Sequence, residues 1–238
     1  MNFNTLLELM MRHQASDLFI TAEREPTIKV NGVLQSVSSN KLTKDQAHQI
    51  VTGIMNAGQR AEFEKTHECN FAIEAGALGR FRVSALTQRD CAAMVLRRIQ
   101  TEVPSWQELA LPPVLSELVM HKRGLILFVG GTGTGKSTSL AALIRHRNEN
   151  SSGHIITIED PMEYVHAHGG CIITQREVGL DTDSYEVALK NTLRQAPDVI
   201  LIGEIRTRET MQHAITFAET GHLCLSTLHA NNANQALD

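Results

Sequence analysis

Two patterns of apolar residues divide the chain near residue 100. In the first part, apolar residues spaced as in a helix cover residues 4–12, and Thr43 begins a second helical stretch. Short apolar or alternating runs predict strands over residues 17–21, 27–30, 33–37, 67–74, 79–88 and 92–99. Asn31-Gly32 is typical of a two-residue hairpin turn, which needs positive φ at both positions. These elements predict a mixed, mainly antiparallel α+β domain over residues 1–99.

From Gly124 onward, continuous apolar runs alternate with helical patterns. The runs cover residues 125–129, 154–159, 199–204 and 222–227. Helical patterns over 185–195 and 208–219 separate most of them. Strands that are apolar on both faces and joined by helices indicate a parallel sheet covered on both sides. The predicted fold class is α/β, with this domain over residues 117–238. Three prolines in the intervening stretch predict a linker over residues 100–116.

Composition narrows the class of protein. The 238 residues are 42% hydrophobic, which suffices for one or two domains with sizeable cores. A net charge of −4 and an aromatic content of only 4% disfavour nucleic-acid binding. The apolar runs are too short to span a membrane, and the first residues lack the basic region of a signal peptide. The four widely spaced cysteines lack metal-ligand spacing and are expected to be buried thiols in a reducing cytosol.

A glycine-rich stretch follows the strand predicted over 125–129. Gly130-x4-Gly135-Lys136-Ser137 fits the P-loop pattern, in which backbone N–H groups hold phosphate oxygens at a helix N-terminus. Lys136 is expected to reach the β and γ phosphates, and the Ser137 hydroxyl to ligate Mg²⁺. The residues predicted to bind the nucleotide are Gly130, Gly131, Thr132, Gly133, Thr134, Gly135, Lys136, Ser137 and Thr138.

Polar residues end three other predicted strands. Glu159, Asp160 and Glu163 follow one strand, Glu204 ends a second, and Thr227 and His229 end a third. The carboxyl ends of parallel strands lie at one edge of a sheet, beside the phosphate loop. Hydrolysis needs a carboxylate that orients water, a metal ligand and positive charge near the γ-phosphate. The sequence therefore predicts nucleotide hydrolysis as well as binding.

Four segments, in order, resemble the motifs of the secretion-type ATPases, the hexameric motors of type II secretion and type IV pili. GGTGTGKS resembles the Walker A motif, IEDPMEY the aspartate box, LIGEIR the Walker B motif and TGHLCLSTLHANNA the histidine box. Within this superfamily, ASDLFIT, GRFRVSA and QREVGLDTDSYEVALKNTLRQAPDVILIGE look closest to the pilus retraction motors, and among them to the accessory retraction ATPase. The resemblance implies a PAS-like domain over 1–99 and a RecA-like domain over 117–238.

The same resemblance implies the function and the partners. An ATP- and Mg²⁺-dependent ring of six subunits would assist pilus retraction in twitching motility, at the cytoplasmic side of the inner membrane. Its partners would be the main retraction ATPase and the inner-membrane platform protein, without nucleic acid. Family members continue beyond the position of Asp238, so the RecA-like domain is expected to be incomplete at its C-terminus.

The resemblance also assigns roles to single residues. Glu163 would be the general base or water-orienting acid, and Glu204 would act near Mg²⁺. His229, together with His222, would line the γ-phosphate side. Arg82 and Arg97, with Arg80 and Arg98 as neighbours, match arginines that reach the phosphates from the N-terminal domain.

Two alternative functions stay open. One is a motor for pilus assembly or type II secretion. The other is a nucleotide-binding ring subunit without turnover, although the presence of Lys136, Glu163 and Glu204 argues against it.

Overall fold

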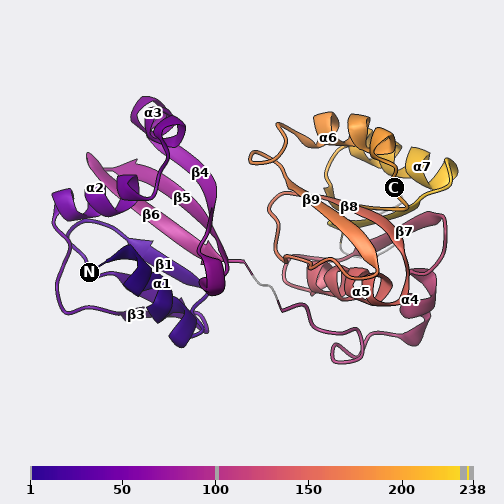
Figure 1. The fold of residues 1–238 in the computed structure, drawn as a ribbon, viewed down its shortest axis with the longest axis horizontal. Coiled ribbons are helices and arrows are strands. Elements are labelled where there is room, and N and C mark those ends of the chain that lie inside the picture. Colours follow the sequence, from indigo (N-terminus) through magenta and orange to yellow (C-terminus); the bar gives the residue numbers. More distant parts are fainter. Residues whose placement is uncertain (1, 100–101, 231–234, 236–238) are drawn as a thin grey trace. The chain divides into compact units, whose positions relative to one another are not determined.

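The computed structural model describes residues 2–99, 102–230 and 235, and Figure 1 shows their fold. The chain forms two compact units, residues 1–99 and residues 100–238. Within the described ranges, no helix combines the length and the apolar character that crossing a bilayer requires.

The first unit is built on a six-stranded antiparallel sheet with the order β3-β2-β1-β6-β5-β4. Its strands are β1 (Asp17–Ile20), β2 (Thr27–Val30), β3 (Val33–Ser36), β4 (Glu68–Glu74), β5 (Arg80–Gln88) and β6 (Cys91–Arg98). The predicted strands are thus confirmed within one or two residues. Asn31 and Gly32 have φ values of 49° and 82°, which confirms the predicted hairpin turn.

Helices α1 (Phe3–Arg12), α2 (Lys44–Gly53) and α3 (Ala57–Thr66) complete the first unit. Thr43 caps α2 through a reciprocal capping box with Gln46, as its position in the sequence indicated. Helix α3 was not predicted, because Phe63 is its only buried residue and it has no apolar stripe. The capping box that Asn56 and Gln59 form at its start was the available signal.

The second unit is built on a five-stranded parallel sheet with the order β7-β11-β10-β8-β9. Its strands are β7 (Gly124–Val129), β8 (Gly153–Glu159), β9 (Cys171–Glu177), β10 (Val199–Ile205) and β11 (Leu223–Leu228). Its helices are α4 (Pro113–Leu118), α5 (Lys136–Asn150), α6 (Tyr185–Thr192) and α7 (Arg208–Glu219), with 3₁₀ turns η1 (Gly76–Leu78) in the first unit and η2 (Leu193–Gln195) after α6. The parallel sheet is confirmed, while the edge strand β9 was missed.

Helices cover both faces of the parallel sheet. One face packs on α5, where Leu143 and Ile144 meet Ile155, and the other packs on α6 and α7, where Phe217 and Leu189 belong to the same buried cluster as Ile156. Successive residues of a strand therefore pack alternately against the helices on the two faces of the sheet. Both sets must be apolar, which explains the unbroken apolar runs in the sequence. All four cysteines are buried free thiols.

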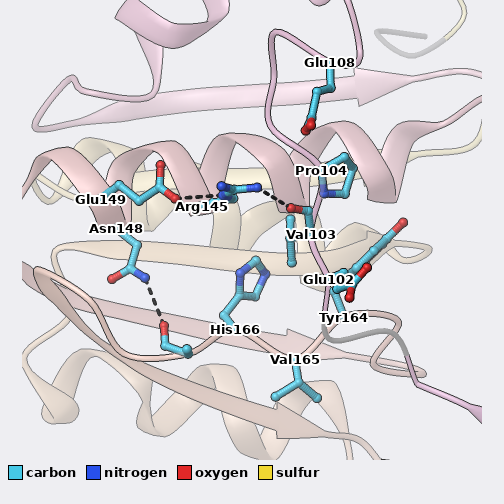
Figure 2. Close-up of a pocket in the computed structure, with 11 residues that line it drawn as sticks. Glu102, Val103, Pro104, Glu108, Arg145, Asn148, Glu149, Tyr164, Val165 and His166 are labelled. Carbon is cyan, nitrogen blue, oxygen red and sulfur yellow. Dashed lines mark hydrogen bonds and ion pairs between the residues drawn. The ribbon is translucent and has the colours of Figure 1, made fainter.

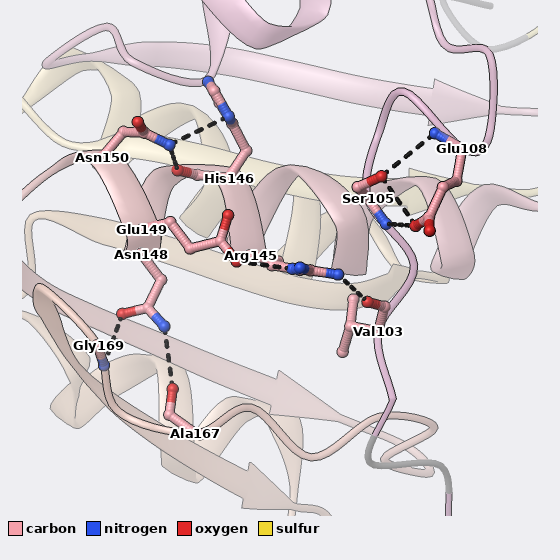
Figure 3. Close-up of polar contacts among 10 residues, drawn as sticks. All are labelled: Val103, Ser105, Glu108, Arg145, His146, Asn148, Glu149, Asn150, Ala167 and Gly169. Carbon is pink, nitrogen blue, oxygen red and sulfur yellow. Dashed lines mark hydrogen bonds and ion pairs between the residues drawn. The ribbon is translucent and has the colours of Figure 1, made fainter.

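The described part of the stretch predicted as a linker is folded onto the second unit. Trp106 packs against the core on the α5 side, and its ring stands edge-on to His146 with centroids 6.0 Å apart. Arg145 of α5 donates from Nη1 to the carbonyl of Val103 over 2.6 Å, and Ser105 and Glu108 bond each other reciprocally (Figure 3). Clusters of Gly and Pro mark turns in a sequence, but they do not show whether the segment between two turns packs on a core.

We expect Trp106→Ala to lower the free energy of unfolding of the second unit by about 1–3 kcal/mol, because it removes a large, partly buried ring. Urea denaturation followed by circular dichroism measures this change. Gln107→Ala, at an exposed neighbouring position, is the control. Equal stability of the two variants would show that residues 103–111 do not contribute to the fold of this unit.

Candidate nucleotide-binding site

The glycine-rich loop joins the carboxyl end of β7 to the first turn of α5. Gly133 and Gly135 have φ values of 77° and 86°, a backbone conformation that L-residues with a side chain rarely adopt. A Cβ on Gly130 would lie 3.0 Å from the Thr134 hydroxyl, so this glycine has little room for a side chain. Gly135 is the N-cap of α5 and supplies no side-chain cap, so the first N–H groups of the helix are available to an anion.

Lys136 supplies the positive charge of the loop. Its ammonium group donates to the carbonyls of Gly130 and Gly131 over 2.8 and 2.7 Å. The Thr134 hydroxyl also donates to Gly131 O, over 2.9 Å. The charge therefore lies over the loop itself, where backbone N–H groups and the helix dipole also favour negative charge.

A cavity of about 210 Å³ lies beside this loop, at the carboxyl ends of the strands. The predicted residues that line it are Ser137, Glu163, Glu204, Thr227 and His229, together with Glu159 and Asp160. They come from α5 and from the ends of β8, β10 and β11. The structure thus brings together side chains that are up to 92 positions apart in the chain, from Ser137 to His229.

Glu204 is held on both carboxylate oxygens. His229 Nε2 lies 3.0 Å from Oε1, and Arg206 Nε donates to Oε2 over 2.6 Å. A second nitrogen of Arg206 lies 3.6 Å from Asp160. Sequence reasoning missed Arg206, although it stands two positions after Glu204 and alternation along the strand places both side chains on one face.

The carboxylates of the β8 end differ in their surroundings. Glu159 is partly buried and accepts hydrogen bonds from Thr157 and Gln175 over 2.6 and 3.4 Å. Burial raises the pKa of Glu159 to about 7 against these bonds, and the charges of Glu163 and Glu177 add to the rise. Glu163 is exposed and lines the cavity. Water can reach this exposed carboxylate inside the cavity, which makes Glu163 a candidate for orienting the attacking water.

The oxygen atoms around the cavity suit a magnesium nucleotide better than a free metal. Within residues 2–99, 102–230 and 235, no cluster of three His, Cys, Asp or Glu side chains could hold an ion. Mg²⁺ is usually bound through one or two protein oxygen ligands together with substrate phosphates and water. Ser137 and Glu204 line one cavity and fit that set.

Three other predicted residues, His222, Arg82 and Arg97, are not among those that line this cavity. His222 precedes β11 at its amino end, the opposite end from the cavity, and its Nδ1 lies 3.3 Å from Phe217 O. The expectation that it lines the γ-phosphate side is therefore wrong, because the parallel strand separates it from His229. Arg82 and Arg97 belong to the first unit, where they are direct cross-strand partners on β5 and β6. Arg97 also pairs with the buried Asp17 over 2.8 Å.

A second, larger cavity of about 750 Å³ lies along α5 (Figure 2). The segment after residue 101, the α5 residues Arg145 and Asn148, and the loop after β8 line it. Tyr164 and His166 of that loop line both cavities, and Tyr164 donates to the Thr138 hydroxyl over 3.2 Å. Burial lowers the pKa of His166 to about 4, so the ring is neutral at pH 7. No motif of the sequence indicated this cavity.

The chain is similar in sequence to known pilus ATPases. The chain is 64% identical over its whole length to the type IV pilus ATPase PilU of Pseudomonas aeruginosa and spans 62% of that protein. It is 41% identical over its whole length to the type IV pilus retraction ATPase PilT of the same organism and spans 69% of it.

Two solved structures have a similar fold. The pilus retraction motor PilT with bound ADP superposes with a TM-score of 0.91 at 40% identity, over 97% of this chain and 68% of the other. The ATPase DotB of Legionella pneumophila superposes with a TM-score of 0.82 at 26% identity, over 98% of this chain and 67% of the other. The family described as type II/IV secretion system protein matches residues 2–238. The chain is therefore a member of the type II/IV secretion system protein family.

Proposed function

We propose that this chain is part of an ATP-hydrolysing motor that assists type IV pilus retraction in twitching motility. The main support for this proposal is that the end of the phosphate loop lines the same cavity as Glu163, Glu204 and His229. Similarity to proteins described as a type IV pilus ATPase, a type IV pilus retraction ATPase and a twitching motility protein supports the biological setting.

Each group of the site has a chemical task in this proposal. The amides of residues 130–135 and Lys136 bind the phosphates, while Ser137 and Glu204 would hold Mg²⁺. The metal ion, when bound, neutralises charge on the β and γ phosphates. Glu163 orients the attacking water and accepts its proton. His229, fixed by Glu204, presents its other ring nitrogen away from that carboxylate, which suits a contact to the γ-phosphate.

The proposal extends to assembly. We assign a PAS-like fold to the first unit and a RecA-like fold to the second, with six subunits in a ring. The main retraction ATPase and an inner-membrane platform protein are the proposed partners, at the cytoplasmic face of the inner membrane. Arg82 and Arg97, direct cross-strand partners on β5 and β6, are the arginines that we propose to complete a site shared between subunits.

We expect two variants to separate binding from chemistry. Lys136→Ala removes the cation of the loop, so both nucleotide affinity and ATP turnover fall. Glu163→Gln keeps affinity but lowers turnover by about 10²–10⁴-fold, because the amide cannot accept a proton. Phosphate release and the fluorescence of a labelled ADP report the two quantities separately.

Glu159→Gln is the matched control for Glu163→Gln. The amide resembles the protonated form that Glu159 populates near pH 7, so this variant should keep most of its turnover. If Glu163→Gln hydrolyses ATP normally and Glu159→Gln is inactive, the catalytic carboxylate is Glu159 and the proposed role of Glu163 is wrong. Absence of turnover by the unmodified chain would reject the function itself.

The shared-site proposal predicts that specific activity depends on protein concentration. We expect phosphate release per subunit to fall on dilution as the ring dissociates. Arg82→Gln and Arg97→Gln should each lower turnover at high concentration by about 10³-fold or more, since an arginine at the γ-phosphate contributes about 10³–10⁵.

Arg89→Gln is the control, because Arg89 is exposed at the turn between β5 and β6, at the other end of the same hairpin from the Arg82–Arg97 pair. A specific activity that stays constant down to the monomer range, with both test variants unimpaired, would leave a self-contained ATPase in place of a ring.

A further inference from the structure

The hydroxyl of Tyr185 is buried, and its proton has no acceptor among the residues that the structure describes. Tyr185 is the first residue of α6, and part of its ring packs against the core under the sheet. A buried hydroxyl whose proton has no acceptor loses hydration that it had in the unfolded chain, which costs free energy. A phenylalanine would fill the same space without that cost, so the oxygen needs an explanation.

The phenol lies between the ends of two strands that supply the site. Gly203 of β10 leaves the space for it: a Cβ there would lie 3.0 Å from the Tyr185 oxygen and 3.1 Å from Cα of Glu159. The oxygen is therefore next to the residue that precedes Glu204 and next to the end of β8. It reaches the catalytic edge of the sheet from the opposite side to α5.

The surroundings of the phenol keep its proton in place. Burial is the main cause that raises the pKa of Tyr185, and the negative charges of Asp160 and Glu159 raise it further. The backbone N–H of Glu204, which can donate only to the phenol oxygen, and the guanidinium of Arg206 lower the pKa and are outweighed. The hydroxyl is thus a neutral donor beside the end of β8, the strand that leads into Glu159 and Asp160.

Asp160 has more capacity to accept this proton than Glu159. Glu159 already accepts from Thr157 and Gln175. Within the described ranges, Asp160 pairs with Arg206, at the longer distance of 3.6 Å. Asp160 also begins the turn that leads to Glu163, so a bond to Asp160 would fix the start of the segment that carries the proposed base.

We propose that Tyr185 is a positioning residue of the ATPase site, whose hydroxyl donates to the Asp160 carboxylate when nucleotide occupies the cavity. The bond holds the turn of residues 160–163 so that Glu163 faces the attacking water. Without nucleotide the donor stays unbonded, and the fold carries that cost. This inference rests on the proposed ATPase function and names a part of its machinery that the sequence motifs did not include.

Tyr185→Phe in the full chain tests the inference, because stability and activity should change in opposite directions. Removing an unbonded buried hydroxyl should raise the melting temperature without nucleotide by about 2–5 °C. The same change should lower kcat for ATP by about 10-fold and leave KM nearly unchanged, since the lost bond acts on the geometry of the reaction. Asp160→Asn combined with Tyr185→Phe should lower kcat by less than the product of the two single losses.

Tyr164→Phe is the matched control for stability, because it removes a hydroxyl that does donate, to Thr138. It should leave the melting temperature unchanged or lower it. An unchanged kcat in Tyr185→Phe would overturn the positioning role, and so would kcat losses that multiply in the double variant. A lower melting temperature would show that the hydroxyl is bonded in the resting fold, which also overturns the inference. An unmodified chain without turnover would reject the proposed function, while the melting temperatures would still test the state of the hydroxyl.

Discussion

The parallel alignment of β7, β8, β10 and β11 is the constraint on which the candidate site depends. Because these strands run in the same direction, their carboxyl ends lie at one edge of the sheet. That edge receives the phosphate loop from β7, the carboxylates after β8, Glu204 from β10 and His229 after β11. The two ends of one strand lie at opposite edges of the sheet. His222, which precedes β11, is therefore far from the edge that His229 reaches at the other end of that strand.

Electrostatics determines what this edge can bind. Four carboxylates line the small cavity, those of Glu159, Asp160, Glu163 and Glu204. Arg206 offsets part of that charge through Glu204, and the raised pKa of Glu159 removes another part. The remaining carboxylates would repel a bare triphosphate, whereas a magnesium complex would carry less negative charge, in keeping with the proposed binding by Lys136 and the helix N-terminus.

The sequence predicted the elements whose pattern is strong and local. Continuous apolar runs identified four of the five parallel strands, and the spacing of Gly130, Gly135 and Lys136 identified the phosphate loop. Polar residues after those strands identified Glu163, Glu204 and His229 as neighbours, which the cavity confirms. Their chemical roles stay predictions.

The features that were missed depend on tertiary contacts. Strand β9 has few apolar residues after Ile173, so its pairing with β8 decides its structure. The packing of Trp106 on the α5 side and the placement of Tyr185 against Gly203 join residues far apart in the chain. Arg206 could have been found from its two-residue spacing to Glu204, but its pairing with Asp160 on another strand could not.

Hydrogen–deuterium exchange of the chain with and without magnesium nucleotide tests the central claim most directly, namely that the phosphate loop and three strand ends form one site. Backbone amides that bind a ligand exchange more slowly when it is present. The account predicts protection by Mg·ADP over residues 130–138, and additional protection by a non-hydrolysable Mg·ATP analogue over 159–164, 203–206 and 227–229. Protection confined to other segments, or protection of the phosphate loop alone with both nucleotides, would contradict it.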